Sequence, residues 1–458
     1  MDAEPDYIDD FAQFITASPS SYHAAAEVAR QLDAAGYIGL DERLGWTTGA
    51  GEPPAPGHPA DEAGLGAPGR FYVVRDGAII AWNVPAGAGT TTPFRIVGAH
   101  TDSPGFKLKP KPTVGSNGWL QAGVEVYGGP LLNSWLDREL ELAGRVVTRD
   151  GATHLVRTGP FLRIPQLAIH LDRDANTGLT LDRQRHTSPV FGVGDLSQAD
   201  LLDHLAGLVG DGTLRGSDVA GYDLLTADTA LPRRFGLDDQ LFAAGRMDNL
   251  SSVFAGLVAL LSLAEPDSPR RSDGHISVLA AFDHEELGSE SRSGASGPLL
   301  DDILTRISGG LGATTEQRLR AYAGSWCISA DAGHAVHPNY PEKHDPANRP
   351  IAGGGPLLKI NANQRYATDA RGAALWARAC ADAGVAYQEF VSNNTVPCGS
   401  TIGPLTATRL GISTVDVGVP LLSMHSAREL AHVADPPALS AALSAFFASA
   451  LGPFVTGL

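Results

Sequence analysis

Apolar residues recur at helical spacing near the start of the chain, over residues 7–36, and Ser18-Pro19-Ser20 interrupts them. Proline cannot continue a helix and serine caps helix N-termini, so this stretch predicts two helices separated by a break. Short apolar runs with β-branched and aromatic residues follow and predict strands. These runs lie at residues 70–74, 78–84 and 94–99, and the last has the composition of a buried strand.

The pattern changes twice further along the chain. Between residues 106 and 244, short strand-like runs are separated by Gly, Asn and Pro turns, which predicts a β-rich segment. From Arg246 onward, helical patterns alternate with apolar strands, as is typical of an α/β domain with helices covering a mostly parallel sheet. The expected elements are strands at 122–127, 140–148 and 167–171, helix 251–264, strands 276–282 and 326–330, helix 373–383 and strand 413–417.

We therefore predict one discontinuous α/β domain, residues 1–105 and 245–458, interrupted by a β-rich insert at 106–244. A chain of 458 residues is long enough for two or three domains with a large core. Residues 47–69 are rich in Gly and Pro and predict an inserted surface loop. Residues 436–458 carry no charge, but their apolar side chains recur at helical spacing and predict a helix with one buried face, not a membrane span.

The charge and the cysteines narrow the function classes. The net charge is −17, and a negative surface repels phosphate backbones and anionic lipids, so we expect neither nucleic acid nor a membrane as a partner. Three cysteines are too few for a disulfide framework or a thiolate zinc site and indicate a reducing compartment. The N-terminus lacks the pattern of a signal peptide, so the expected location is cytoplasmic.

His and carboxylate residues stand just past predicted strands, or in the loops after them, at five places. Because sites in open α/β sheets gather beyond the carboxyl ends of the strands, we expect these places to converge. Imidazole and carboxylate ligands without thiolate suit zinc, cobalt or manganese. The five segments are GAHTD (98–102), GRMDN (245–249), DHEELG (283–288), SADAGH (329–334) and SMHS (423–426).

Two imidazoles and three carboxylates exceed the needs of one tetrahedral ion, but they suffice for two ions that share a bridging Asp. Such a centre would polarise a scissile carbonyl and lower the pKa of a bridging water enough to give hydroxide near neutral pH. Of the adjacent Glu285 and Glu286, one would act as general base and the other as a ligand. Asp102 could orient the imidazole of His100 from behind. Each motif alone is more often a turn or cap, so their shared position after strands carries the inference.

Nine segments, in order and with compatible spacing, closely resemble the aspartyl aminopeptidase family (M18) of metallopeptidases. The resemblance implies a dizinc exopeptidase fold, with a mostly parallel mixed sheet flanked by helices, and an inserted dimerisation domain. The segments are GAHTDSPGFKLKP (98–110), WLDRELELAGRV (135–146), RIPQLAIHL (163–171), GRMDNL (245–250), DHEELGSES (283–291), SADAGHAVHPNYPEKHD (329–345), GPLLKINANQRYATD (355–369), PCGSTIGPL (397–405) and SMHSARE (423–429).

The same resemblance implies two Zn²⁺ per subunit, with Co²⁺ or Mn²⁺ as substitutes, and one Asp that bridges the ions. It makes Glu285 the general base and Asp102 the partner behind the first imidazole. The implied ligands are His100, Asp248 and Asp331 for one ion, and Asp248, Glu286 and His425 for the other.

For the substrate, the resemblance implies that Lys359 pairs with an acidic side chain, although a lone lysine at a strand end is ordinarily a solvated surface residue. His170 would reach from the insert into a neighbouring subunit's active site, whereas its pattern alone is that of a strand histidine. His334 and His337 would line the substrate pocket or serve as structural loop histidines. The relatives form dodecamers built from dimers, so we expect a closed homo-oligomer.

The residues and this resemblance together lead us to expect a cytoplasmic dizinc aminopeptidase that removes N-terminal Asp or Glu from peptides, with a metal-bridged hydroxide and Glu285 as base. A dizinc aminopeptidase for neutral N-terminal residues, and a related carboxypeptidase or deacylase, remain open as alternatives. A metal-free assembly protein that keeps the fold as a scaffold is the non-enzymatic alternative, and the intact ligand positions argue against it.

Overall fold

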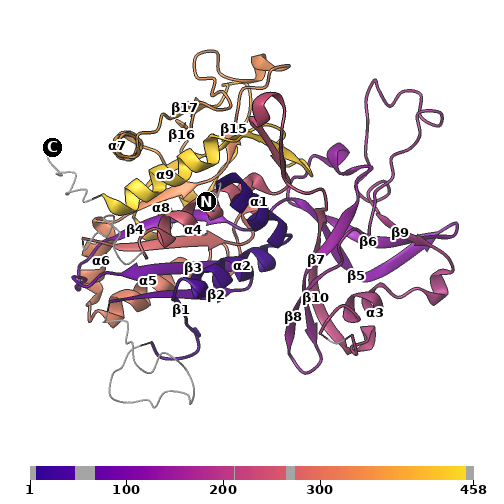
Figure 1. Ribbon diagram of the computed structural model, residues 1–458, viewed down its shortest axis with the longest axis horizontal. Coiled ribbons are helices and arrows are strands. Elements are labelled where there is room, and N and C mark those ends of the chain that lie inside the picture. Colours follow the sequence, from indigo (N-terminus) through magenta and orange to yellow (C-terminus); the bar gives the residue numbers. More distant parts are fainter. Residues whose placement is uncertain (1–6, 47–67, 211, 265–273, 450–458) are drawn as a thin grey trace, which may run out of the picture.

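The computed structural model describes residues 7–46, 68–210, 212–264 and 274–449. A nine-stranded mixed sheet forms the centre of its larger part (Figure 1). The four central strands, β13, β4, β14 and β18, run parallel to one another. In sheet order the strands are β1 (Ile38–Gly39), β2 (Gly69–Arg75), β3 (Ala78–Val84), β13 (Ile276–Phe282), β4 (Phe94–His100), β14 (Trp326–Ala330), β18 (Ser413–Gly418), β16 (Leu357–Ile360) and β17 (Gln388–Val391).

Helices cover both faces of this sheet. Every residue of β4 and β13 is buried, because alternate side chains of both strands enter two separate hydrophobic cores. One core contains α1 (Tyr7–Ala17), α2 (Ser21–Ala34), α4 (Met247–Leu261), α7 (Ala370–Ala383) and α9 (Asp435–Ala448). The opposite core contains α5 (Leu299–Gly310), α6 (Thr315–Ala323) and α8 (Ile402–Leu410).

A six-stranded antiparallel sheet forms the second part of the molecule and lies beside the first (Figure 1). It has its own core, on which α3 (Leu201–Ala206) packs. In sheet order the strands are β8 (Thr153–Arg157), β7 (Leu140–Thr148), β10 (Val219–Asp228), β5 (Gly105–Ser116), β6 (Trp119–Tyr127) and β9 (Val190–Val193).

Smaller elements connect the two parts. The strands β11 (Arg233–Phe235) and β12 (Leu241–Ala244) do not join the six-stranded sheet: β11 pairs with β12, and β12 pairs with β20 (Glu429–His432). In a further small sheet, β15 (Gly333–His334) pairs with β19 (Pro420–Leu421). The chain thus returns from the insert next to the segment that carries His425. In the described ranges, the short 3-10 helices are η2 (Leu132–Trp135), η3 (Leu196–Gln198), η4 (Gly216–Asp218), η5 (Leu237–Asp239), η6 (Glu285–Leu287) and η7 (Pro341–Lys343).

The structure confirms the predicted α/β class and most of the expected elements, including the two N-terminal helices with the Ser20 cap between them. The strand predicted at 167–171 is wrong: these residues are irregular at 167–168 and form a turn at 169–171, and Leu167 and Leu171 are 57% and 75% exposed. Alternation alone cannot make a strand where no partner strand lies alongside. Most of the predicted loop, residues 47–67, lies outside the described residues. None of the helices in the described ranges has both the length and the apolar character that crossing a bilayer requires.

Candidate active site

Five predicted ligands meet at the carboxyl edge of the large sheet. His100 ends β4, Glu286 lies in η6 after β13, and Asp331 follows β14. The other two are Asp248, at the start of α4, and His425, in the loop after β19. His100, Glu286 and Asp331 are brought together because β4, β13 and β14 run parallel and end at one edge, whereas His425 reaches the cluster from the loop after β19, a strand of a separate small sheet.

Asp248 lies between the two imidazoles. Its Oδ1 is 3.3 Å from His100 Nε2, and its Oδ2 is 3.4 Å from His425 Nε2. On the outer sides, Asp331 Oδ1 is 3.5 Å from His100 Nε2, and Glu286 Oε2 is 3.4 Å from His425 Nε2. Ligand atoms at tetrahedral angles and about 2.0–2.1 Å from one zinc ion lie about 3.3–3.4 Å apart. The spacing fits two ions that share Asp248.

The orientation of both imidazole rings also fits a metal. Nδ1 of His100 lies 3.0 Å from the Asp102 carbonyl oxygen and 3.4 Å from Asp102 Oδ1. Nδ1 of His425 lies 3.0 Å from the Gly129 carbonyl oxygen. A ring nitrogen that faces such acceptors carries the proton, which leaves the Nε2 lone pair for a cation. The buried Oδ1 of Asp248 and Oε1 of Glu286 accept no hydrogen bond, so they too suit a cation.

The titration of the cluster indicates an excess of negative charge. Burial opposes a charge on His100, but the neighbouring carboxylates, Asp102 foremost, raise the pKa of this imidazole well above its usual value. Burial raises the pKa of Glu286 well above its usual value, and the charge of Asp248 adds to this. Burial likewise raises the pKa of Glu285 to about 8. Cations placed among these groups would relieve this excess.

Asp102 supports both the first imidazole and the turn that carries the two glutamates. Its carboxylate accepts the backbone N–H groups of Glu285 at 3.0 Å and Glu286 at 3.1 Å. His284, with φ 64°, and Gly288, with φ 91°, flank this turn in the left-handed region, which lets the chain reverse tightly after β13. Glu285 Oε2 lies 4.0 Å from His100 Nε2, a longer distance than the 3.3 to 3.5 Å between the imidazoles and the proposed ligand carboxylates.

Two supporting residues were not predicted from the sequence. Glu429 is buried in β20, where its two oxygens accept the backbone N–H groups of Asp248 at 3.0 Å and His425 at 2.9 Å. Tyr127, at the end of β6 in the insert, donates its hydroxyl to Asp102 Oδ2 at 2.9 Å. The only sequence signal for Glu429 was its place in the SMHSARE segment, four residues after the histidine.

Lys359 is not a surface lysine. It lies in β16 with 2% of its side chain exposed, and its Nζ donates to the Ala332 carbonyl at 2.7 Å. The same Nζ is 3.8 Å from Asp331 Oδ2 and lies 5.3 Å from the centre of the Tyr366 ring. The ammonium group therefore stands directly beside the proposed metal cluster.

A pocket of about 260 Å³ lies near this lysine, which is not itself one of the lining residues. Tyr366 forms part of its wall, as does Ser423 from the loop that carries His425. Among the described residues that line the pocket, none is Asp or Glu, although the chain as a whole has a net charge of −17. The basic lining residues are His334, His337, Lys343 and His344.

His170 is not part of this cluster. It lies in the turns of the insert, its side chain is exposed, and none of the contacts described above involves it. Within one subunit, the structure therefore brings together the five predicted ligands, Glu285, Asp102, Lys359 and His334, but not His170.

The chain matches known proteins over nearly its whole length. The family model described as aminopeptidase I zinc metalloprotease (M18) matches residues 14–447. The chain belongs to the M18 family of aminopeptidases. Two relatives are the probable M18 family aminopeptidases 2 of Streptomyces avermitilis, 52% identical over 96% of this chain and 97% of the relative, and of Mycobacterium leprae, 44% identical over 96% and 98%.

Solved structures show the same fold. The cryo-EM structure of the Ape4 and Nbr1 complex contains a chain with a TM-score of 0.88 and 34% identity, over 97% of this chain and 85% of that one. The Saccharomyces cerevisiae mApe1 dodecamer has a TM-score of 0.80 and 28% identity, over 96% of each chain. Membership of the M18 family confirms the resemblance seen in the sequence and makes the protein an aminopeptidase, a peptide hydrolase.

Proposed function

We propose that this M18 aminopeptidase removes N-terminal Asp or Glu from peptides at a centre of two zinc ions. The observation that carries the metal centre is the position of Asp248, which presents one carboxylate oxygen to each of two imidazoles. His100, Asp248 and Asp331 would hold one ion, and Asp248, Glu286 and His425 the other. Bound zinc would lower the pKa of a water molecule and polarise the scissile carbonyl.

Glu285 is the proposed general base. It comes directly before a proposed ligand, but its own carboxylate lies farther from the imidazoles than the paired carboxylates do. The Asp102 carboxylate accepts a hydrogen bond from the backbone N–H of Glu285, which fixes the backbone position from which the Glu285 side chain extends. A carboxylate in this position accepts the proton of the attacking water and passes it to the leaving amine, while the neighbouring carboxylates attract the free α-ammonium group of the substrate.

The acidic specificity is supported by the charge of the pocket. Three histidines and Lys343 line it, and no described lining residue carries a carboxylate. The buried Lys359 ammonium lies next to one wall residue, 5.3 Å from the centre of the Tyr366 ring. A carboxylate side chain within this pocket would therefore meet, among the described lining residues, only neutral or positive groups. Charge-assisted pairing in such a partly dry site favours Asp or Glu over an apolar residue of similar size.

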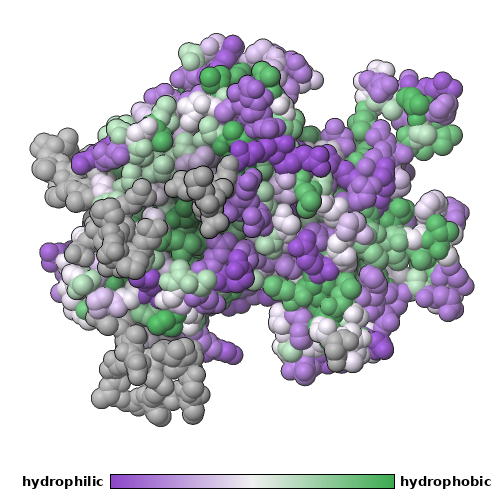
Figure 2. Space-filling model, in the orientation of Figure 1, coloured by the Kyte–Doolittle hydropathy of each residue, from purple (hydrophilic) through white to green (hydrophobic). Residues whose placement is uncertain are grey.

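We further propose a homo-oligomer in which the insert forms dimers and His170 reaches a neighbouring active site. Leu167, Ile169 and Leu171 surround His170 in the sequence and are 57%, 44% and 75% exposed. Figure 2 shows apolar residues gathered on the surface of this insert. An exposed apolar segment suits burial against another subunit. A dodecamer, the state named for the yeast relative, is the assembly that we propose.

We place the protein in the cytoplasm. All three cysteines, Cys327, Cys380 and Cys398, are free thiols. Free thiols are usual in a reducing compartment.

The function is tested by an activity profile over Asp-, Glu- and Leu-amides and N-acyl-Asp-amide, with chelator and with restored zinc. We expect fast cleavage of the Asp and Glu amides, no cleavage of the N-acylated substrate, loss of activity with chelator and recovery with zinc. Preference for Leu would instead establish the neutral aminopeptidase. Cleavage of the N-acyl substrate would establish a deacylase. Activity that persists with chelator would contradict the proposed metal centre.

A further inference from the structure

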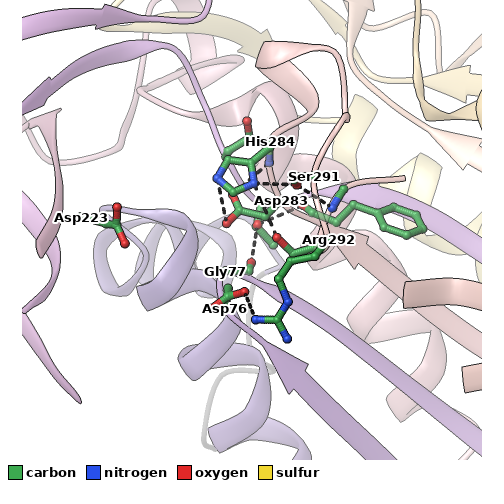
Figure 3. Close-up of polar contacts among 12 residues, drawn as sticks. Asp76, Gly77, Asp223, Asp283, His284, Ser291 and Arg292 are labelled. Carbon is green, nitrogen blue, oxygen red and sulfur yellow. Dashed lines mark hydrogen bonds and ion pairs between the residues drawn. The ribbon is translucent and has the colours of Figure 1, made fainter. Parts of the chain in front are cut away.

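The two-residue turn between β2 and β3, Asp76-Gly77, contacts both the insert and the loop that carries the two glutamates. Asp76 Oδ1 accepts from Arg145 Nη1 of β7 in the insert at 2.8 Å. Asp76 Oδ2 accepts from Arg292 Nη1, in the loop after η6, at 2.9 Å. Figure 3 shows the second pair, with Asp223 of the insert across from the turn. One carboxylate therefore joins two segments that are otherwise far apart in the chain.

Several contacts fix the side chain of Arg145 in the insert. Its Nε donates to Asp223 Oδ2 of β10 at 3.0 Å, and Asp223 Oδ1 accepts from Lys107 Nζ of β5 at 2.8 Å. Its guanidinium lies 4.5 Å from the centre of the Tyr22 ring in α2. With 25% of the Arg145 side chain and 20% of the Asp76 side chain exposed, this pair is better shielded from water than an ordinary surface ion pair.

The loop after β13 is closed on itself. Asp283 N donates to the Ser293 carbonyl at 3.1 Å, and Ser289 N donates to the His284 carbonyl at 2.9 Å. Nδ1 of His284 lies 2.9 Å from Ser291 Oγ (Figure 3). These bonds join the segment before Glu285 to the segment after it. A shift at one end of residues 283–293 is therefore transmitted to the turn that carries the glutamates.

The end of β2 and the β2–β3 turn contact this loop at two further points. Arg75 Nη1 donates to the Arg292 carbonyl at 3.1 Å, in addition to the hydrogen bond that the Arg292 side chain donates to Asp76. A Cβ atom on Gly77 would overlap the Asp283 carboxylate and the Ser21 hydroxyl, so the turn packs directly against the residue that begins the loop. Little room is left for the loop to move independently of the turn.

We infer that Asp76 is a positioning residue that couples the insert, through Arg145, to the loop carrying Glu285 and Glu286. The position of the insert then helps to set the position of the base, and the loss of either bond to Asp76 loosens the glutamate turn. The consequence for turnover rests on the proposed function, whereas the consequence for the loop itself does not.

The test uses the full chain in four variants: Asp76→Asn, Arg145→Gln, Arg292→Gln and the control Arg149→Gln. Arg149 lies at the β7–β8 turn, and its Nε donates to the Ser217 carbonyl within the insert, so it matches Arg145 in charge but not in contact. Arg292 has 67% of its side chain exposed, so its replacement leaves the folded protein intact even if Arg145→Gln does not fold. Hydrogen exchange of residues 283–297 and the values of kcat and KM for Asp-amide are measured.

We expect exchange in residues 283–297 to quicken several-fold in the three coupling variants, and kcat to fall about 5- to 10-fold with KM within about twofold. Arg149→Gln should match the wild type in both. Wild-type exchange in Arg292→Gln and Asp76→Asn would overturn the coupling, as would an equal effect of Arg149→Gln. Faster exchange with unchanged kcat would retain the coupling of the loop and refute its effect on turnover.

Discussion

Replacement of Lys359 by Met tests the acidic specificity most closely. Met keeps the length and the apolar stem of the lysine, so the packing of this 2%-exposed side chain changes little while its charge is lost. An ammonium about 4 Å from a substrate carboxylate, at the effective dielectric constant of about 20 found near protein surfaces, contributes about 4 kcal/mol. Because Asp331 Oδ2, at 3.8 Å, shares this ammonium, we expect a net loss of about 3 kcal/mol, or about 100-fold in kcat/KM.

The assay compares kcat/KM for Asp-amide and Leu-amide in the wild type and the variant. The Asp-amide value should fall about 100-fold and the Leu-amide value less than about 5-fold, since only the former substrate needs the cation. Loss of the contact with Asp331 affects both substrates, so the ratio is the informative quantity. Lys343→Met is the matched control, because Lys343 lines the pocket near Lys359 with an exposed side chain, and it should change the ratio less than about threefold. Equal losses for both substrates in Lys359→Met would refute the reasoning.

Two further substitutions test the chemistry and its support. Glu285→Gln should lower kcat by about 10²- to 10⁴-fold while the protein keeps its zinc, because the base is lost but no proposed ligand is; a kcat within tenfold of the wild type would assign the base elsewhere. The two carboxylate oxygens of Glu429 accept the backbone N–H groups of Asp248 and His425, and Glu429→Gln replaces one of these oxygens by an NH₂ group, which can only donate. This variant should weaken zinc binding about 10- to 100-fold in a chelator competition. An unchanged zinc affinity there would show that Glu429 acts only in folding.

Much of the site could be predicted from the sequence because its main residues follow directly from strands that are easy to recognise. β4 and β13 are buried along their whole length, and their composition shows it. Parallel strands end at one edge of a sheet, so His100 and Glu286 were expected at the same edge, and the pairing of β4 with β13 in the structure makes them neighbours. The imidazole and carboxylate side chains at these positions then indicated a metal site.

The supporting residues could not be predicted because they depend on long-range pairing. Glu429 reaches Asp248 across 181 residues, through a strand that joins a small separate sheet. Tyr127 enters the site from the insert, which no local pattern near residue 127 reveals. Lys359 illustrates a third difficulty, since a lysine is ordinarily solvated and only the position of β16 next to β18 and Asp331 explains its burial.

The central claim is that Asp248 bridges two cations, and the zinc content per subunit tests it most directly. The wild-type protein and the Asp248→Ala variant are loaded with zinc, freed of loosely bound metal by dialysis and analysed for metal and protein. We predict two zinc ions per wild-type subunit and almost none in the variant, because both ions lose a shared ligand. One zinc ion or none in the wild type, or two ions retained by Asp248→Ala, would contradict the account.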